Sequence, residues 1–230
     1  MKKDTWFTSD PHYGHKKVIE YCARPYADIV EMERSMIENH NAVVKPFDKV
    51  YYLGDVFFCG MVHAKEILAK LNGYKILIRG NHDRDAKKML ELGFNEVHDS
   101  LEIEIGKHRV NLSHFPYKPY TGDIDEKVLA RIQQLKAEAR KTGKDSTSQL
   151  DAALSEPPYD GLITNEQKER LISYDMRFWS RRFEDKGQWL LCGHVHEKWA
   201  QKKRMINVGV DVRGFKPMSI EEVEAIINGT

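Results

Sequence analysis

The stretch YKILIRGNHD, residues 74–83, shows the pattern from which the fold can be inferred. Its first half is an apolar run of strand length that stops abruptly at a glycine. Gly80, Asn81 and Asp83 are residue types that end strands and begin helices, through backbone freedom and side-chain capping. The segment alone predicts a buried strand and a capped turn. Asn81 and His82 are uncommon choices for such a turn, so a ligand role stays the alternative.

The same form recurs along the chain. Apolar, β-branched or aromatic runs end in Asp, Asn or His in four more segments: DTWFTSDPH (4–12), KVYYLGD (49–55), HRVNLSH (108–114) and QWLLCGHVH (188–196). Segments with helical periodicity, such as residues 28–44, 61–71 and 84–92, lie between the first strands. Alternating strands and helices predict an α/β layered domain, whose functional residues lie beyond the carboxyl ends of the strands.

Composition excludes several classes of protein. The 230 residues are 41% hydrophobic and 31% charged, as in an ordinary globular protein. A net charge of +1 implies no extended nucleic-acid or acidic-membrane surface. No apolar run has the length of a membrane span, and the N-terminus lacks the apolar core of a signal peptide. The three scattered cysteines predict no disulfide framework, so we expect a cytoplasmic protein. Because no apolar run is long enough to span a membrane, we expect no membrane binding.

One long segment departs from the alternation. Residues 117–187 contain no strong strand and carry two predicted helices, within 124–144 and 165–183. The segment falls between two polar clusters, which favours a lid or wall over a site. A helical hairpin on the surface is the alternative. We therefore expect one domain over residues 1–230, with residues 117–187 as a helical insertion in it.

The polar clusters indicate a metal site more strongly when they are considered together. Each would be weak alone, but five strand ends bring several imidazoles and oxygen donors toward one edge. A mixed set of such ligands favours Mn, Fe or Zn, and a surplus of ligands predicts two ions that share a carboxylate. The clusters contain nine candidate residues: Asp10, His12, Asp55, Asn81, His82, Asp83, His114, His194 and His196.

The order D-x-H, G-D, G-N-H-D, H, G-H-x-H closely resembles the calcineurin-like metallophosphoesterases, including small bacterial and phage members. The resemblance runs from Asp10 to His196 and includes all five blocks in order. It implies a four-layer α/β/β/α sandwich around two mixed β-sheets. The helical insertion has no counterpart in compact members of the family.

The resemblance also implies roles for individual residues. The family pattern makes Asp55 the carboxylate that bridges two metal ions. It makes His82 the histidine that faces the substrate, oriented by Asp83. Asp10, His12 and His196 would bind the first ion, and Asn81, His114 and His194 the second. The implied cofactors are two divalent transition-metal ions, Mn first, with Fe, Zn or Ni as alternatives.

The expected function is that of a metal-dependent phosphoric ester hydrolase. By resemblance, a hydroxide that bridges the metals attacks the phosphorus of a phosphodiester or nucleotide-like ester. The sequences GDVFFCG and GNHD depart from the pattern of the phosphoprotein phosphatases, so we do not expect phosphoproteins to be the substrate. Oligomeric state is not predicted.

Two other functions stay open. The segment RFWSRRF (177–183) combines arginines and aromatic rings, which suits a nuclease or nucleic-acid end-processing enzyme. A catalytically inactive scaffold that only binds metal is the third hypothesis, although the chain keeps every block. Of the histidines outside the blocks, His15 can reach the substrate or cap a helix, and we expect His40 to face solvent.

Overall fold

The structure is a computed structural model that describes residues 4–118, 126–142, 150, 152–155, 158, 162, 164 and 176–229. It divides into two compact units, Met1–Tyr117 with Phe183–Thr230, and Lys118–Arg182. The first unit carries both sheets and all nine candidate residues. None of the helices among the described residues has the length and apolar character that a membrane span needs. The expected cytoplasmic location stays a prediction.

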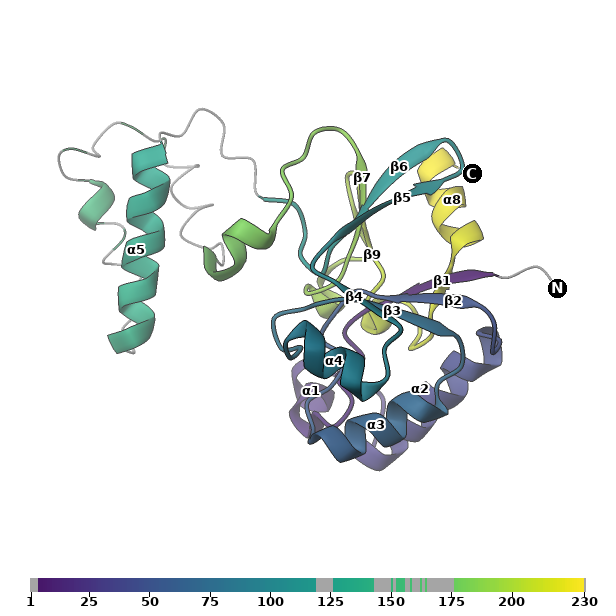
Figure 1. The fold of residues 1–230 in the computed structure, drawn as a ribbon. Helices are drawn as coiled ribbons and strands as arrows, with labels where there is room; N and C mark the ends of the chain where they lie inside the picture. The colour runs from purple at the N-terminus through teal and green to yellow at the C-terminus, as the bar shows by residue number, and fades with distance from the viewer. Residues whose placement is uncertain are drawn as a thin grey trace. The chain divides into compact units, whose positions relative to one another are not determined.

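The first sheet has five strands in the order β10-β1-β2-β3-β4. Strands β1 to β4 are parallel, and β10 pairs with β1 in the antiparallel direction. Helices α1 to α4 lie along one face of this sheet (Figure 1). The strands are β1 (Thr5–Thr8), β2 (Lys49–Tyr52), β3 (Tyr74–Ile78), β4 (Glu96–His98) and β10 (Met218–Ser219). The helices are α1 (Lys16–Tyr21), α2 (Ile29–Val43), α3 (Met61–Lys70) and α4 (Ala86–Leu92).

Local capping fixes where the helices of this layer begin. The carboxylate of Asp28 accepts a hydrogen bond from the backbone N–H of Glu31 at the start of α2. Asp85 caps α4 in the same way through the N–H of Lys88. Met32 and Met36, both on the predicted apolar face of α2, are buried in the core between the helices and the first sheet.

The expected exposure of His40 is wrong. This histidine is only 3% exposed, and its Nε2 lies 3.1 Å from the carbonyl oxygen of Asn72. Its ring also stacks on Tyr52, with centroids 6.0 Å apart. The polar neighbours of His40 in the sequence suggested solvent, but the loop before β3 covers this turn of α2 and supplies a hydrogen-bond acceptor.

The second sheet is also mixed, with the order β5-β6-β7-β9-β8. Strands β6, β7 and β9 are parallel, while β5 and β8 are antiparallel to their neighbours. Residues from both sheets, such as Phe7, Leu53, Val110 and Leu191, form one buried cluster between them. The predicted α/β fold with two mixed sheets is confirmed. The strands are β5 (Leu101–Ile105), β6 (His108–Leu112), β7 (Trp189–Cys192), β8 (Gln201–Lys202) and β9 (Met205–Asn207).

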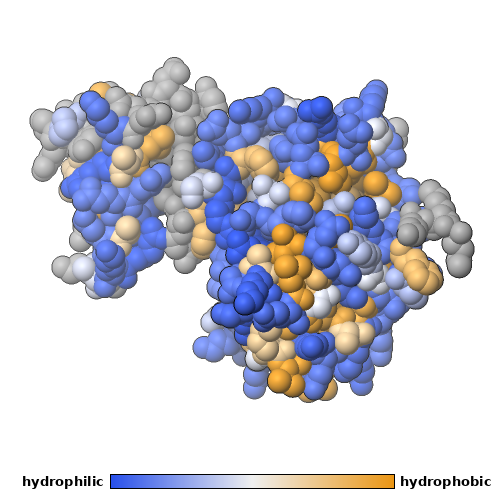
Figure 2. Space-filling view, viewed as in Figure 1, coloured by the Kyte–Doolittle hydropathy of each residue, from blue (hydrophilic) through white to orange (hydrophobic). Residues whose placement is uncertain are grey.

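A C-terminal helix closes the side of this core. Helix α8 (Ile220–Asn228) lies beside β5 and β6 (Figure 1), and its Val223 belongs to the cluster between the sheets. Ser219 and Glu222 form a reciprocal capping box at its start. In Figure 2 the visible apolar side chains gather near α8 and over α3 and α4, while the rest of this face of the unit is mostly hydrophilic.

The second unit contains helix α5 (Glu126–Thr142) and a short 3-10 helix, η1 (Met176–Arg181). The first predicted helix of the insertion therefore exists as α5. Most of the second, within residues 165–183, lies outside the described residues. Its described part is 3-10 rather than α-helical and is interrupted at Phe178, so a regular α-helix does not extend through residues 176–181. The role of residues 117–187 as a lid stays a prediction.

Candidate metal centre

The loops that follow β1, β2, β6 and β7 are tied together at one edge of the two sheets. The backbone N–H of Asp10 donates to the carbonyl of Gly54 at 3.0 Å, which joins the loops after β1 and β2. The N–H of Gly193 donates to the carbonyl of His114 at 3.0 Å, which joins the loops after β6 and β7. Carboxyl ends of parallel strands meet at the same edge, and these bonds bring the predicted blocks together there.

The backbone at this edge is unusual. Five of the candidate residues have positive φ angles, a conformation that residues other than glycine seldom adopt. Such conformations cost about 1–3 kcal/mol each and cluster at functional sites. The five are Asp10 (55°), His12 (54°), Asp55 (54°), His194 (70°) and His196 (46°). The loops thus accept backbone strain at the residues whose side chains turn toward one another.

Two glycines let the chain segments approach closely enough for this. Gly54 has a φ of 92°, and a Cβ there would lie 2.5 Å from the backbone nitrogen of Gly80. A Cβ on Gly80 would in turn collide with Oδ1 of Asp55. The glycines in the second and third blocks therefore make room for the Asp55 carboxylate between two loops.

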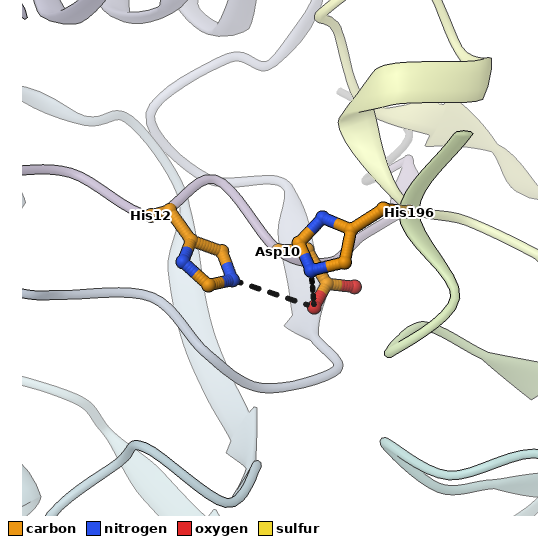
Figure 3. Close-up of side chains that lie close together, drawn as sticks. All are labelled: Asp10, His12 and His196. Atoms are coloured by element: carbon orange, nitrogen blue, oxygen red, sulfur yellow. Dashed lines mark ion pairs between the residues drawn. The ribbon is translucent and has the colours of Figure 1, made fainter. Parts of the chain in front are cut away.

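The first ligand group consists of Asp10, His12 and His196, and Figure 3 shows both imidazole rings directed at the carboxylate. Oδ1 of Asp10 lies 3.8 Å from Nε2 of His12 and 3.9 Å from Nε2 of His196. Asp10 Oδ1 and His12 Nε2 are buried and have no hydrogen-bond partner among the described residues. Buried polar atoms need partners, so a cation held between these atoms fits the group.

The second ligand group forms around His114. Its Nδ1 lies 2.7 Å from the carbonyl oxygen of Leu53 and must donate to it, so Nε2 is the nitrogen that carries the lone pair when the ring is neutral. That Nε2 lies 3.2 Å from Oδ1 of Asn81 and 3.2 Å from Nδ1 of His194. Oxygen and imidazole donors meet here without a cysteine, a set that suits a divalent transition metal.

Asp55 stands between the two groups. Its Oδ2 lies 3.4 Å from Nε2 of His114 in the second group and 4.0 Å from Nε2 of His12 in the first. Its other oxygen accepts a hydrogen bond from the backbone N–H of His82 at 2.9 Å. A carboxylate in this position is suited to contact cations on both sides.

The charges of these groups shift one another's protonation. Burial raises the pKa of Asp10, but the neighbouring imidazoles outweigh burial and hold it well below its usual range. Burial lowers the pKa of His114, yet the carboxylates of Asp55 and Asp10 raise it to about 9. Burial lowers the pKa of His196, but the hydrogen bonds to Asp211 and Cys22 and the charge of Asp10 together raise it to about 11. Each shift reports strong attraction between this site and positive charge.

Two of the candidate ligand histidines, His12 and His196, have a partner on their other ring nitrogen. Nδ1 of His12 lies 3.1 Å from Nδ1 of His15, and Nδ1 of His196 lies 3.1 Å from Oδ2 of Asp211. Such partners set the tautomer and the ring orientation of metal ligands. Asp211 is absent from the predicted site. Asp211 comes shortly after β9, as the other candidate residues come shortly after their strands, so the sequence did carry a signal for it.

His82 and Asp83 take different positions at the site. The side chain of His82 is 48% exposed, and its Nε2 lies 4.0 Å from Oδ2 of Asp55. Partial burial lowers the pKa of His82, which the charge of Asp55 opposes. The carboxylate of Asp83 accepts hydrogen bonds from the backbone N–H groups of Asp55, Val56 and Gly80. These bonds hold the loops, and the expected role of Asp83 toward the His82 ring stays a prediction.

Known proteins share this sequence and fold. An uncharacterized protein, MJ1445, of Methanocaldococcus jannaschii is 34% identical over 126 residues, which are 54% of this chain and 65% of that protein. The Gene 66 protein of Mycobacterium phage L5 is 28% identical over 242 residues, covering 98% of this chain and 94% of that protein. The solved structure of AQ665, a protein of unknown function from Aquifex aeolicus, has a TM-score of 0.58 and 24% identity, covering 98% of this chain and 100% of its own.

The family predicted from the order of the blocks is confirmed by a match that begins before β1 and ends in the loop after β7. Residues 4–198 match the calcineurin-like phosphoesterases, and the chain belongs to that family.

Proposed function

We propose that the protein is a dinuclear metal-dependent phosphoesterase that hydrolyses a phosphodiester or another nucleotide-like phosphate ester. The observation that carries the proposal is the arrangement of two ligand groups on either side of Asp55, with an exposed histidine beside it. A scaffold that only binds metal would not need an exposed histidine beside the ligand groups.

Most of the candidate residues would hold the cations, and the cations in turn would bind the substrate. Asp10, His12 and His196 would hold one cation, Asn81, His114 and His194 the other, and Asp55 both. When bound, two divalent cations would bind the phosphate oxygens and lower the pKa of a water between them, which supplies the nucleophile at neutral pH.

His82 is the residue that would act on the leaving group. Its ring is accessible, and its backbone is fixed by the hydrogen bond from its N–H to Asp55. A donor at this position can hydrogen-bond or protonate the departing oxygen, a contribution of typically about 10²–10⁴ in rate. Its ring packs on Phe58, with centroids 4.4 Å apart, and that contact limits where the imidazole can point.

Neighbouring aromatic rings support a nucleotide-like substrate. The ring of Phe58 packs on His82 on one side and on His15 on another. The Phe58 and His15 rings are nearly parallel, with centroids 4.3 Å apart. The ring of Tyr21 follows, with its centroid 6.2 Å from that of His15. Tyr21 is 66% exposed at the end of α1. Aromatic faces beside a phosphate site provide stacking surfaces for a nucleobase, at about 1–3 kcal/mol per base.

A metal-reconstituted activity screen tests the proposal. Protein freed of metal and loaded in turn with Mn²⁺, Fe²⁺, Zn²⁺ or Ni²⁺ would be assayed on phosphomonoesters, linear and cyclic nucleotide diesters, and single- and double-stranded nucleic acid. We expect hydrolysis of small diesters, with Mn²⁺ the most effective ion. Preference for nucleic acid over every small ester would favour the nuclease alternative, and inactivity with all ions would contradict the proposal.

A further inference from the structure

Outside the proposed ligands, a buried ion pair joins Arg24 to Asp211. We propose that these two residues form a positioning pair that fixes the first ligand group, so that its loss weakens one cation site and spares the other. The inference rests on the proposed function, because it presumes that the ligand groups bind cations.

The guanidinium of Arg24 uses all five of its N–H groups. Nε donates to Oδ1 of Asp211 at 2.7 Å, and Nη2 donates to Oδ2 of the same carboxylate at 3.0 Å. Nη2 also donates to the carbonyl of Asp10 at 2.8 Å, and Nη1 donates to the carbonyl of Pro11 at 2.8 Å and to Sδ of Met32 at 3.5 Å. The side chains of Arg24 and Asp211 are 0% and 2% exposed. A bidentate, saturated guanidinium has one geometry, which makes it a rigid connector.

The connector joins three distant segments of the chain. Arg24 lies between α1 and α2, Asp10 and Pro11 follow β1, and Asp211 lies in the short 3-10 helix η3 (Val210–Val212). Asp10 is itself a ligand of the first group. Asp211 holds another, because its Oδ2 lies 3.1 Å from Nδ1 of His196 and directs the opposite nitrogen, Nε2, toward Asp10. One guanidinium therefore sets the backbone of one ligand and, through Asp211, the ring of a second.

The second ligand group is held by other contacts. His114 is fixed by the carbonyl of Leu53. The backbone N–H of Asp55 donates to the Asp83 carboxylate, and the Asp55 carboxylate accepts the N–H of His82. The two groups touch through the N–H of His194, which donates to Oδ2 of Asp10 at 2.9 Å, and through the N–H of His12, which donates to the carbonyl of Asp55 at 3.2 Å; neither bond involves Arg24 or Asp211. Disturbing the pair should thus change the affinity of the first group much more than that of the second.

Replacing Asp211 with asparagine would remove this control at nearly constant volume. An amide offers one carbonyl oxygen to three N–H donors, two from Arg24 and one from His196. If its NH₂ turned toward His196, Nδ1 would have to accept, and the proton would move to Nε2, the nitrogen needed for a cation. Substitutions at such outer partners typically lower metal affinity by about 10–100-fold.

The test is a Mn²⁺ titration of the full chain as wild type, Asp211→Asn and Asp48→Asn, followed by calorimetry and electron paramagnetic resonance. Asp48 is the matched control, because it is buried and also accepts three N–H hydrogen bonds, from Asp4, Lys45 and the Trp6 indole. It precedes β2 and so lies at the opposite end of the strand from the site.

We expect two bound ions with a spin-coupled signal in the wild type and in Asp48→Asn. Asp211→Asn should keep one ion, bind the other about 10–100-fold more weakly, and show the signal of isolated Mn²⁺ at one equivalent. If Asp211→Asn fails to fold, Arg24→Lys replaces it in the titration, and we expect a smaller loss of Mn²⁺ affinity at the same site. Equal affinities in wild type and Asp211→Asn, or an equal loss in Asp48→Asn, would overturn the pair's role. A wild type that binds no ion would overturn the proposed function instead.

Discussion

The side chain of Asp83 holds the backbone of Asp55: its Oδ2 accepts the hydrogen bond of the Asp55 N–H at 2.9 Å. The same oxygen accepts the N–H of Gly80 at 2.7 Å, and Oδ1 accepts that of Val56 at 3.1 Å. Asp55 returns the contact by accepting the N–H of His82. The loops after β2 and β3 therefore fix each other at the residue shared by both ligand groups.

Removing the Asp83 carboxylate should destabilise the fold. Asp83→Ala leaves three N–H groups without their acceptor, and hydrogen bonds to a charged group contribute about 1.5–3 kcal/mol each. We expect the free energy of unfolding, measured with urea, to fall by about 3 kcal/mol or more. Asp85→Ala is the control, because this exposed cap of α4 should cost only about 1 kcal/mol. Equal losses in the two variants would contradict the bracing role.

Substitutions at His82 and Asp55 should separate catalysis from metal binding. His82→Ala should keep both ions and the fold but lose about 10²–10⁴ in kcat, because only the group near the leaving oxygen is removed. Asp55→Ala should lose metal, because the carboxylate faces both ligand groups. Metal content by elemental analysis, measured beside kcat on the substrate found by the screen, checks both. A His82→Ala protein stripped of its ions would show that the division of roles is wrong.

The exposed ring of Tyr21 should matter only for substrates that carry a base. We expect Tyr21→Ala to raise KM about tenfold for thymidine 5′-p-nitrophenyl phosphate, from the loss of one stacking contact. KM for methyl p-nitrophenyl phosphate, which has the same leaving group and no base, should stay unchanged. Phe47→Ala is the matched control, because Phe47 is 71% exposed just before β2, away from the site. A similar change with both esters would argue against stacking.

Stability should fall with acid through His40. Burial lowers its pKa from 6.5 to about 4 in the folded state, although the hydrogen bond to Asn72 opposes the shift. The unfolded chain therefore binds the proton first, so this contribution is complete above pH 6.5 and is lost as the pH falls toward 4. Between pH 7 and pH 5 the loss should be about 2 kcal/mol.

Urea unfolding at the two pH values measures that loss. His40→Gln should remove this part of the pH dependence. His63→Gln, at an exposed histidine on α3, should keep the wild-type slope. Identical slopes in wild type and His40→Gln would show that His40 does not couple stability to pH.

Much of the fold and the candidate site could be predicted from local pattern. Apolar runs that end in Asp, Asn or His predicted strands of the two sheets, because strand length and burial leave a direct trace in residue type. The same runs predicted that Asp10, Asp55 and His114 would lie at one edge, because parallel strands place their carboxyl ends together. The exposure of His40 was not predictable in this way, since its cover comes from a loop far along the chain.

Residue types next to strand ends predicted an α/β domain and the residues that could bind cations. The order of the five blocks predicted the family, and the resemblance to that family implied two mixed sheets. How those residues are held depends on contacts between segments that are far apart in the chain. Positive φ angles at Asp10 and Asp55 arise from packing between loops. The pair of Arg24 and Asp211 joins residues 187 positions apart. No local pattern records such a contact, because its energy exists only after the segments have come together.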